Sequence, residues 1–184
     1  MTEIFKYYAG IGSRETPKEI MEIMSRIATH LEVDGYTLRS GGAPGADTAF
    51  SEGCMRKQIF VPWRGFQNLP MTHEIPFEAY NIAAEHHPIW PALKPGLQKL
   101  MARNTLQILG PTCNDPSEFV LCWTQDGITD GKRTSRRTGG TGQALRVAAA
   151  HNVPIYNLNC KDIEGLVKHL ASEFNVPSLK NGLP

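Results

Sequence analysis

The sequence predicts an α/β fold in which helices cover an open parallel sheet. Short apolar runs alternate with segments in which apolar residues recur at helical spacing, starting with residues 4–11 and the helix behind them. Short connections between these segments favour parallel pairing with right-handed crossovers. Glycine-rich turns stand between the two kinds of segment at residues 10–14, 40–45 and 138–143. We therefore expect a Rossmann-like sheet of order about 3-2-1-4-5, with an irregular insertion after the third strand.

Composition is that of a globular protein. The 184 residues are 41% hydrophobic and 20% charged, with a net charge of +1, so we expect one domain over residues 1–184. This charge gives no global attraction to nucleic acid or membranes, although a local basic patch would not show in the total. No apolar run approaches ~20 residues, and the start of the chain does not resemble a secretory signal. We expect a cytoplasmic protein with no membrane partner.

The cysteines are scattered and form no C-x-x-C pair; they are Cys54, Cys113, Cys122 and Cys160. Free thiols are the expected state in a cytoplasmic protein. The same spacing argues against a zinc site, and we expect neither a metal nor a cofactor.

The first strand, residues 4–11, is mostly apolar and aromatic, as buried parallel strands are. The run Thr16-Pro17-Lys18-Glu19 predicts a capping box with proline at the first helical position. The helix behind it has apolar residues at helical spacing, namely Ile20, Ile23, Met24, Ile27, Ala28 and Leu31. Gly35 marks its end.

The second strand, residues 36–38, leads into the glycine turn and then a helix over residues 46–57. Pro44 suits a first helical turn. Asp47 also falls in that turn, where the helix dipole favours a carboxylate.

A third strand at residues 58–62 precedes an irregular segment, residues 63–96, rich in proline and aromatic residues. So long an irregular stretch indicates a lid, a binding loop or a small subdomain. A short helix fits residues 77–87. The aromatic side chains could stack on a base, but packing of the segment onto the domain is the commoner use.

Helical spacing returns at residues 97–109, and residues 117–124 form a fourth strand. The loop after it carries a basic run, Lys132, Arg133, Arg136 and Arg137, and opens a helix over residues 144–151. A run of this kind is usually a solvated surface.

A fifth strand at residues 153–158 and a helix at residues 163–174 complete the pattern. We expect residues 176–184 to fray.

All three glycine turns follow strands, so they are expected at one edge of the sheet, where the strand order reverses and ligands bind. Main-chain N–H groups and helix N-termini there suit a phosphate. The predicted ligand-binding residues are Gly10, Gly12, Ser13, Arg14, Ser40, Gly41, Gly42, Gly45, Asp47, Arg103, Asn104, Gly139, Gly140, Thr141, Gly142 and Gln143. Asp47 and Asp126 are candidates for binding ribose hydroxyls or for acid–base catalysis, and either could equally be a cap or a turn former.

These residues carry a resemblance. Gly10–Arg14, Ser40–Asp47 and Gly139–Gly142 before an alanine-rich helix resemble the SLOG superfamily, which includes DNA-processing protein A (DprA/Smf) and the LOG phosphoribohydrolases. The second motif is similar to S-G-G-A-x-G-I-D of DprA, and Arg103-Asn104 is similar to its R-N pair. The resemblance covers most of the chain outside residues 63–96. It implies a Rossmann-like nucleotide-binding fold.

The chain departs from the LOG pattern P-G-G-x-G-T-x-x-E. Gln143 stands at the threonine and Arg146 at the catalytic glutamate. The resemblance therefore points away from the LOG reaction and toward a stand-alone DprA-like core.

Three functions follow as hypotheses. The first is binding of a nucleotide or nucleotide-derived small molecule. The second is cleavage or transfer at the N-glycosidic bond of a nucleotide, with Asp47 and Asp126 as the carboxylates. The third is DprA-like binding of single-stranded DNA by the basic run and exposed aromatic residues. The sequence leaves turnover open, and a homo-oligomer is among the alternatives.

Overall fold

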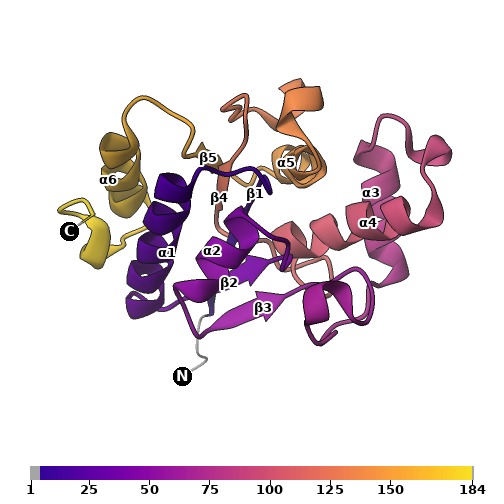
Figure 1. The fold of residues 1–184 in the computed structure, drawn as a ribbon, viewed down its shortest axis with the longest axis horizontal. Helices are drawn as coiled ribbons and strands as arrows, with labels where there is room; N and C mark the ends of the chain where they lie inside the picture. The colour runs from indigo at the N-terminus through magenta and orange to yellow at the C-terminus, as the bar shows by residue number, and fades with distance from the viewer. Residues whose placement is uncertain (1–4, 184) are drawn as a thin grey trace.

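The computed structural model describes residues 5–183 and has one five-stranded parallel sheet of order β3-β2-β1-β4-β5. The predicted fold class and strand order are confirmed (Figure 1). The strands are β1 (Lys6–Gly12), β2 (Tyr36–Ser40), β3 (Lys57–Ile59), β4 (Val120–Trp123) and β5 (Ile155–Asn157). The first of the residues predicted for β1, Ile4, lies outside the described residues.

The strand order reverses between β1 and β4. These strands pair from Ala9 with Val120 to Gly12 with Trp123, so both end at the same level. On the other side of β1, β2 runs on to Ser40, which pairs with Ile59. The connections after β1 and β4 therefore leave the sheet side by side, in opposite directions.

Helices cover both faces of the sheet (Figure 1). They are α1 (Lys18–Val33), α2 (Ala46–Glu52), α3 (Phe77–His86), α4 (Pro95–Leu109), α5 (Thr141–Ala150) and α6 (Ile163–Glu173). Residues 5–183 also contain five 3-10 segments: η1 (Phe66–Asn68), η2 (Trp90–Ala92), η3 (Gly131–Arg133), η4 (Arg136–Thr138) and η5 (Pro177–Leu179).

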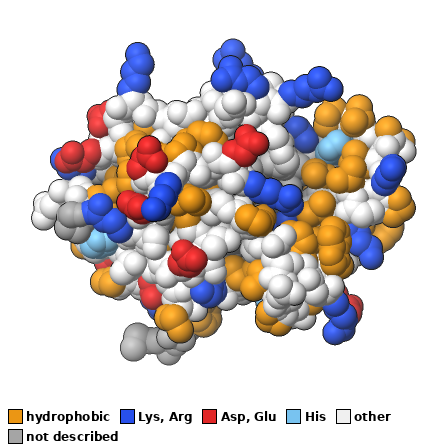
Figure 2. Space-filling model, in the orientation of Figure 1, with side chains coloured by type: hydrophobic (Ala, Val, Ile, Leu, Met, Phe, Trp, Pro, Cys, Tyr) orange, Lys and Arg blue, Asp and Glu red, His pale blue; other side chains and the backbone are white. Residues whose placement is uncertain are grey.

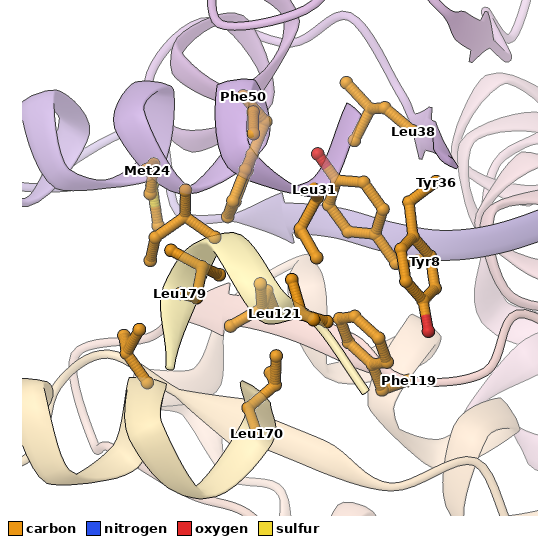
Figure 3. Close-up of a cluster of buried hydrophobic side chains, with 14 of the residues drawn as sticks. Tyr8, Met24, Leu31, Tyr36, Leu38, Phe50, Phe119, Leu121, Leu170 and Leu179 are labelled. Atoms are coloured by element: carbon orange, nitrogen blue, oxygen red, sulfur yellow. The ribbon is translucent and has the colours of Figure 1, made fainter. Parts of the chain in front are cut away.

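Side-chain alternation along the strands divides the core into two layers. Tyr8 and Leu121 face α1, α2 and α6, in a cluster that holds Phe50 and Leu170 (Figure 3). Their neighbours in the strands, among them Ala9, face α4 and α5 on the other side. Since successive strand residues point to opposite faces, one apolar run supplies both layers.

The start of α1 differs from the prediction. Its N-cap is Pro17, and no side chain caps it. The Thr16 hydroxyl instead donates to the Ser13 carbonyl (2.7 Å), so it closes the turn after β1. The predicted capping box is therefore wrong, because the Thr16 hydroxyl bonds to the Ser13 carbonyl and does not cap the helix.

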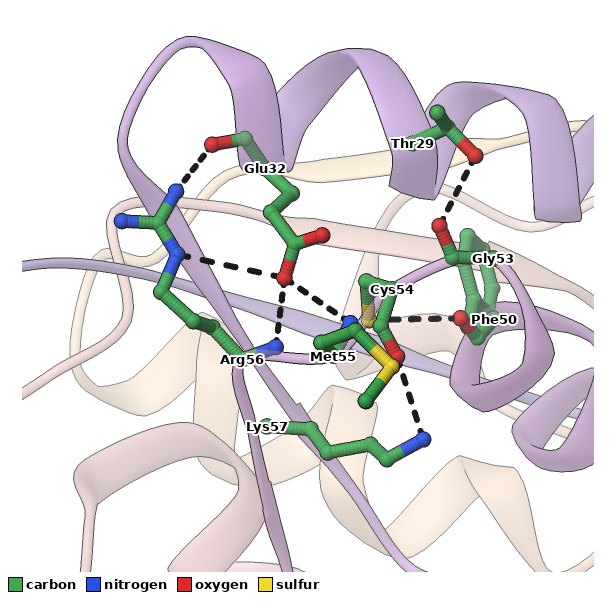
Figure 4. Close-up of polar contacts among 8 residues, drawn as sticks. All are labelled: Thr29, Glu32, Phe50, Gly53, Cys54, Met55, Arg56 and Lys57. Carbon is green, nitrogen blue, oxygen red and sulfur yellow. Dashed lines mark hydrogen bonds and ion pairs between the residues drawn. The ribbon is translucent and has the colours of Figure 1, made fainter.

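Helix α2 begins at Ala46 and ends at Glu52, so Pro44 is outside it and the predicted end at residue 57 is wrong. A Cβ on Gly53 would lie 2.1 Å from the Ser25 carbonyl oxygen, so α1 and the end of α2 pack in direct backbone contact. Glu32 of α1 then accepts hydrogen bonds from the Met55 and Arg56 amides (2.8 and 2.5 Å; Figure 4). These amides turn to α1 instead of continuing the helix.

The predicted fraying of residues 176–184 is wrong for the described part. Val176 and Leu179 are fully buried in the cluster beneath α1 and α6. The Ser178 hydroxyl and amide both donate to Asp34 (2.6 and 3.0 Å). The buried side chains of Val176 and Leu179 and the hydrogen bonds from Ser178 to Asp34 therefore hold this segment in place.

Within the segment 63–96, the predicted helix is confirmed as α3, which packs against α4 and α5. Its other parts are η1, η2, turns and irregular chain, and its last two residues begin α4. Over residues 5–183, no helix is long and apolar enough to cross a membrane. The same residues contain no group of three or more His, Cys, Asp or Glu side chains arranged to hold a metal ion.

Candidate functional site

A pocket of about 460 Å³ opens at the carboxyl ends of β1 and β4. Its walls come from the turn after β1 (residues 12–15), from one side of α4, and from residues 136–141 before and at the start of α5. This is the point of strand-order reversal, where open α/β sheets bind ligands.

Four arginines line the pocket: Arg14, Arg103, Arg136 and Arg137. Arg136 and Arg137 are exposed, whereas Arg103 is only 5% exposed. Figure 2 shows Lys and Arg side chains projecting from the upper edge of the molecule, where Figure 1 places the segment between β4 and α5. Guanidinium groups bind phosphate through paired, charge-assisted hydrogen bonds, so this wall suits an anion.

Apolar side chains also line the pocket. Leu97, Leu100 and Met101 come from α4, and the first of these is 44% exposed. A pocket lined by both guanidinium and aliphatic groups fits a ligand with a charged end and a flat apolar body, as a nucleotide has.

The arginine-bearing segment is held by Asp126. Its carboxylate accepts hydrogen bonds from the hydroxyls of Thr124 (2.8 Å), Ser135 (3.0 Å) and Thr138 (2.5 Å). Burial works to raise the pKa of this carboxyl, but these hydroxyl donors outweigh it and the pKa lies below its usual range. Asp126 does not line the pocket. The carboxylate is positioned to fix the segment that carries Arg136 and Arg137.

The second glycine turn is closed on itself by Asp47. The Gly41 and Ala43 amides donate to the Asp47 carboxylate (3.1 and 3.3 Å). Of the residues in this turn, Ala43 lines the pocket. The amides of Gly41 and Ala43 are thus directed at the protein's own side chain, and the turn acts as a base for the pocket.

Asp47 and Arg103 form a buried pair with 3.8 Å between Oδ2 and Nη1. Burial raises the pKa of Asp47 to about 6, although Arg103 and the backbone donors oppose the rise. Burial likewise lowers the pKa of Arg103. Among the described residues, Arg103 Nε has no hydrogen-bond partner. A buried unpaired donor beside a pocket is a contact that a bound anion could satisfy.

Gln107 was missed by sequence reasoning. With its amide oxygen turned toward the donors, it accepts from the Gly41 amide and from Arg103 Nη1, both at 2.9 Å, and it also lines the pocket. The signal was present, because Gln107 lies four residues after Arg103 and so on the same face of α4. Leu97, Leu100, Met101 and Gln125 were also absent from the predicted set. Arg136 and Arg137 belong to the basic run that the sequence analysis proposed for DNA binding, and they line this pocket as well.

The structure brings many of the predicted site residues to the pocket wall: Gly12, Ser13, Arg14, Asp47, Arg103, Asn104, Gly139, Gly140 and Thr141. Two turns meet directly, since the Ala46 amide donates to the Ser13 carbonyl (3.2 Å). A Cβ on Gly45 would lie 2.5 Å from that carbonyl oxygen, so only glycine permits the contact.

The remaining predicted residues are not part of the wall. Gly10 lies under Leu38 and Phe50, and the Ser40 hydroxyl donates to its carbonyl (2.6 Å). Gln143 donates to the Ala83 carbonyl (3.0 Å) and so ties α5 to α3. Gly41, Gly42, Gly45 and Gly142 are also outside the lining, and so is the second predicted carboxylate, Asp126.

The fold and the pocket together define the class of protein: an open parallel α/β domain with a ligand-sized, arginine-lined pocket at its switch point. No family model matches the sequence, and no curated protein matches it. The fold is similar to that of DNA processing protein A from Helicobacter pylori, in a structure that concerns the single-stranded DNA binding mode of that protein.

That similarity has a TM-score of 0.55 at 18% sequence identity and covers 96% of this chain and 81% of the other. At this identity the likeness shows a shared fold. The resemblance to DprA is therefore supported for the fold.

Proposed function

We propose that this protein binds single-stranded DNA and holds one nucleotide of the strand in the switch-point pocket, with its phosphate at the arginines. The observation that carries the proposal is the convergence of Arg14, Arg103, Arg136 and Arg137 on one pocket of about 460 Å³. The fold shared with a single-stranded DNA binding protein supports this choice of ligand.

Arg136 and Arg137 allow binding in the pocket to be distinguished from binding to a diffuse basic surface. Lys132 and Arg133 belong to the same connection and are also exposed, but they do not line the pocket. The double variants Arg136→Glu/Arg137→Glu and Lys132→Glu/Arg133→Glu therefore make the same change in charge at different distances from the pocket.

The test is fluorescence anisotropy with labelled oligo-dT over a range of salt concentrations. Arg136→Glu/Arg137→Glu should lower the affinity for DNA at least tenfold more than the control, Lys132→Glu/Arg133→Glu. Loss of the contact to this one phosphate should also reduce the slope of log K against log salt by about 0.7. Equal effects of the two double variants, or no binding by the wild type, would refute the proposal.

A second candidate is binding of a free nucleotide or nucleotide derivative. The pocket is within the size range of small-ligand sites, and both cationic and apolar side chains line it. Direct titration of dTMP and AMP without DNA distinguishes the two. A free-nucleotide site should bind a mononucleotide at least as tightly as oligo-dT, whereas a DNA site should bind oligo-dT much more tightly than dTMP. Mass spectrometry of a copurified small molecule would identify such a ligand directly.

Cleavage of an N-glycosidic bond has less support. The Asp126 carboxylate is engaged by three hydroxyls away from the pocket. Asp47 lines the pocket, but its carboxylate accepts two backbone amides and pairs with Arg103. Chromatographic detection of free base from nucleoside monophosphates, lost in Asp47→Asn, would be needed to revive this hypothesis.

A further inference from the structure

The loop after β3 presents an aromatic and a cationic side chain to solvent. Trp63 is 39% exposed, and Arg64 and Gly65 beside it are exposed as well. Figure 1 shows this part of the chain leaving β3 and running below α4. A partly exposed indole beside a guanidinium offers a flat apolar surface and a positive charge to a ligand in solvent.

This loop is attached to the pocket through Phe66. Phe66 is 6% exposed and belongs to a hydrophobic cluster with Ala43, against which Leu100 also packs. The central carbon (Cζ) of the Arg103 guanidinium lies over the Phe66 ring, 5.8 Å from the ring centroid. Ala43, Leu100 and Arg103 all line the pocket, so Phe66 forms part of the layer behind that wall.

Trp63 extends the same layer outward. Its ring meets the Phe66 ring edge to face, with centroids 5.5 Å apart and an interplanar angle of 86°. From the pocket, the order is therefore Arg103, Phe66, Trp63. The indole is supported from behind by a buried ring and remains open to solvent.

The backbone of the loop is held in an uncommon conformation. Gly65, Gln67 and Asn68 have φ of 80°, 50° and 57°. The left-handed region is unfavourable for residues with a side chain, such as Gln67 and Asn68, and such residues concentrate at ligand sites. The Phe66 and Leu69 amides donate to the Trp63 and Phe66 carbonyls (3.3 and 2.9 Å), which fixes the turn.

We propose that Trp63 and Arg64 form a second contact for the DNA strand, outside the pocket. The indole stacks on the base next to the pocket-bound nucleotide, and the Arg64 guanidinium pairs with the adjoining phosphate. The inference rests on the proposed function. Because every base presents a flat π-face and neither side chain needs to read a base edge, this contact accepts any sequence.

The test compares Trp63→Ala with Trp90→Ala in oligo-dT anisotropy. Trp90 is a tryptophan of the same 63–96 segment, half-buried in η2, and serves as the matched control. Stacking of one base contributes about 1–3 kcal/mol, so Trp63→Ala should lose about 5- to 150-fold in affinity. Trp63→Phe should recover most of it. Arg64→Ala should lower the salt slope by about 0.7.

Two further measurements place the contact outside the pocket. Competition by dTMP should be the same in Trp63→Ala as in wild type. Oligo-dT should quench tryptophan emission in the wild type and markedly less in Trp63→Phe, since a stacked base quenches the indole. Thermal melts of each variant check that it is folded.

The inference fails alone if Arg136→Glu/Arg137→Glu weakens DNA binding while Trp63→Ala binds as wild type does. Equal losses in Trp63→Ala and Trp90→Ala would also overturn it. If the wild type binds no oligonucleotide, or Arg136→Glu/Arg137→Glu has no effect, the proposed function fails, and this inference fails with it.

Discussion

At the scale of single residues, the Asp47–Arg103 pair decides the shape of the pocket base. A Cβ on Gly41 would lie 1.3 Å from Arg103 Nη1, so the glycine lets the guanidinium reach the turn. Asp47 then binds the amides of that same turn. Breaking a buried pair leaves an uncompensated charge, which makes each partner depend on the other.

The pair predicts a pH dependence of stability. The pKa of Asp47 is raised from 3.8 to about 6 by burial. Between about pH 4 and 6 the folded protein therefore holds a proton that the unfolded chain releases, so the free energy of unfolding falls as pH rises. A shift of two pKa units corresponds to at most about 3 kcal/mol. Asp47→Asn should flatten this slope, as measured by denaturant unfolding from pH 4 to 7.

Glu164→Gln is the control, because it makes the same carboxylate-to-amide change on an exposed face of α6. Its unfolding profile should keep the wild-type slope. Asp47→Asn will also lower stability overall, so the slope and not the absolute value is the readout. An unchanged slope in Asp47→Asn would contradict the assignment.

At the scale of elements, the connection between β4 and α5 is ordered by polar contacts. A capping box in η4 joins Ser135 and Thr138, and Asp126 accepts a hydrogen bond from each hydroxyl. Ile128 packs on the core at the start of this connection, but residues 132–140 contain no large apolar side chain. Polar contacts therefore fix the part of the connection that carries the arginines.

Asp126→Ala should loosen this connection locally. Hydrogen bonds to a charged group contribute about 1.5–3 kcal/mol, so local opening should become about tenfold or more frequent. Limited trypsin digestion reads this out as faster cleavage after Arg133, Arg136 and Arg137. Asp130→Ala is the matched control, since Asp130 caps only the Lys132 amide (2.9 Å). Equal cleavage rates in the two variants would show that Asp126 does not hold the segment.

At the scale of the whole molecule, the C-terminal segment ties α1 to α6. Leu179 is fully buried in the layer that contains Met24 of α1 and Leu170 of α6 (Figure 3). Ser178 meanwhile binds Asp34 at the end of α1. Residues far apart in the chain are joined here by burial.

Leu179→Ala should lower the free energy of unfolding by about 2–5 kcal/mol, because it opens a cavity in the core. Lys180→Ala, at an exposed neighbouring position, should change it by less than about 0.5 kcal/mol. Denaturant unfolding measures both. A loss below about 1 kcal/mol in Leu179→Ala would mean that the segment adds little to the core.

The sequence by itself determined the strand and helix order, because hydrophobic periodicity and glycine turns are local signals. It also placed Gly12 and Arg14 at one edge, since every parallel strand ends there. Arg103 was a candidate because Arg103-Asn104 resembles the R-N pair of DprA. The end of α2 was not predictable from local sequence. The residues after α2 contact Ser25 and Glu32, which belong to α1, more than 20 residues earlier in the chain.

Only the tertiary structure decided which polar groups face the pocket. Asp126 and Asp47 were equivalent candidates in the sequence. In the structure, Asp126 accepts hydrogen bonds from the loop before α5, whereas Asp47 accepts them from the amides of the second glycine turn. Gln107, Arg136 and Arg137 joined the site through the packing of α4 and α5. Periodicity specifies which face of an element is buried, but the partner of each polar atom is set by distances across the fold.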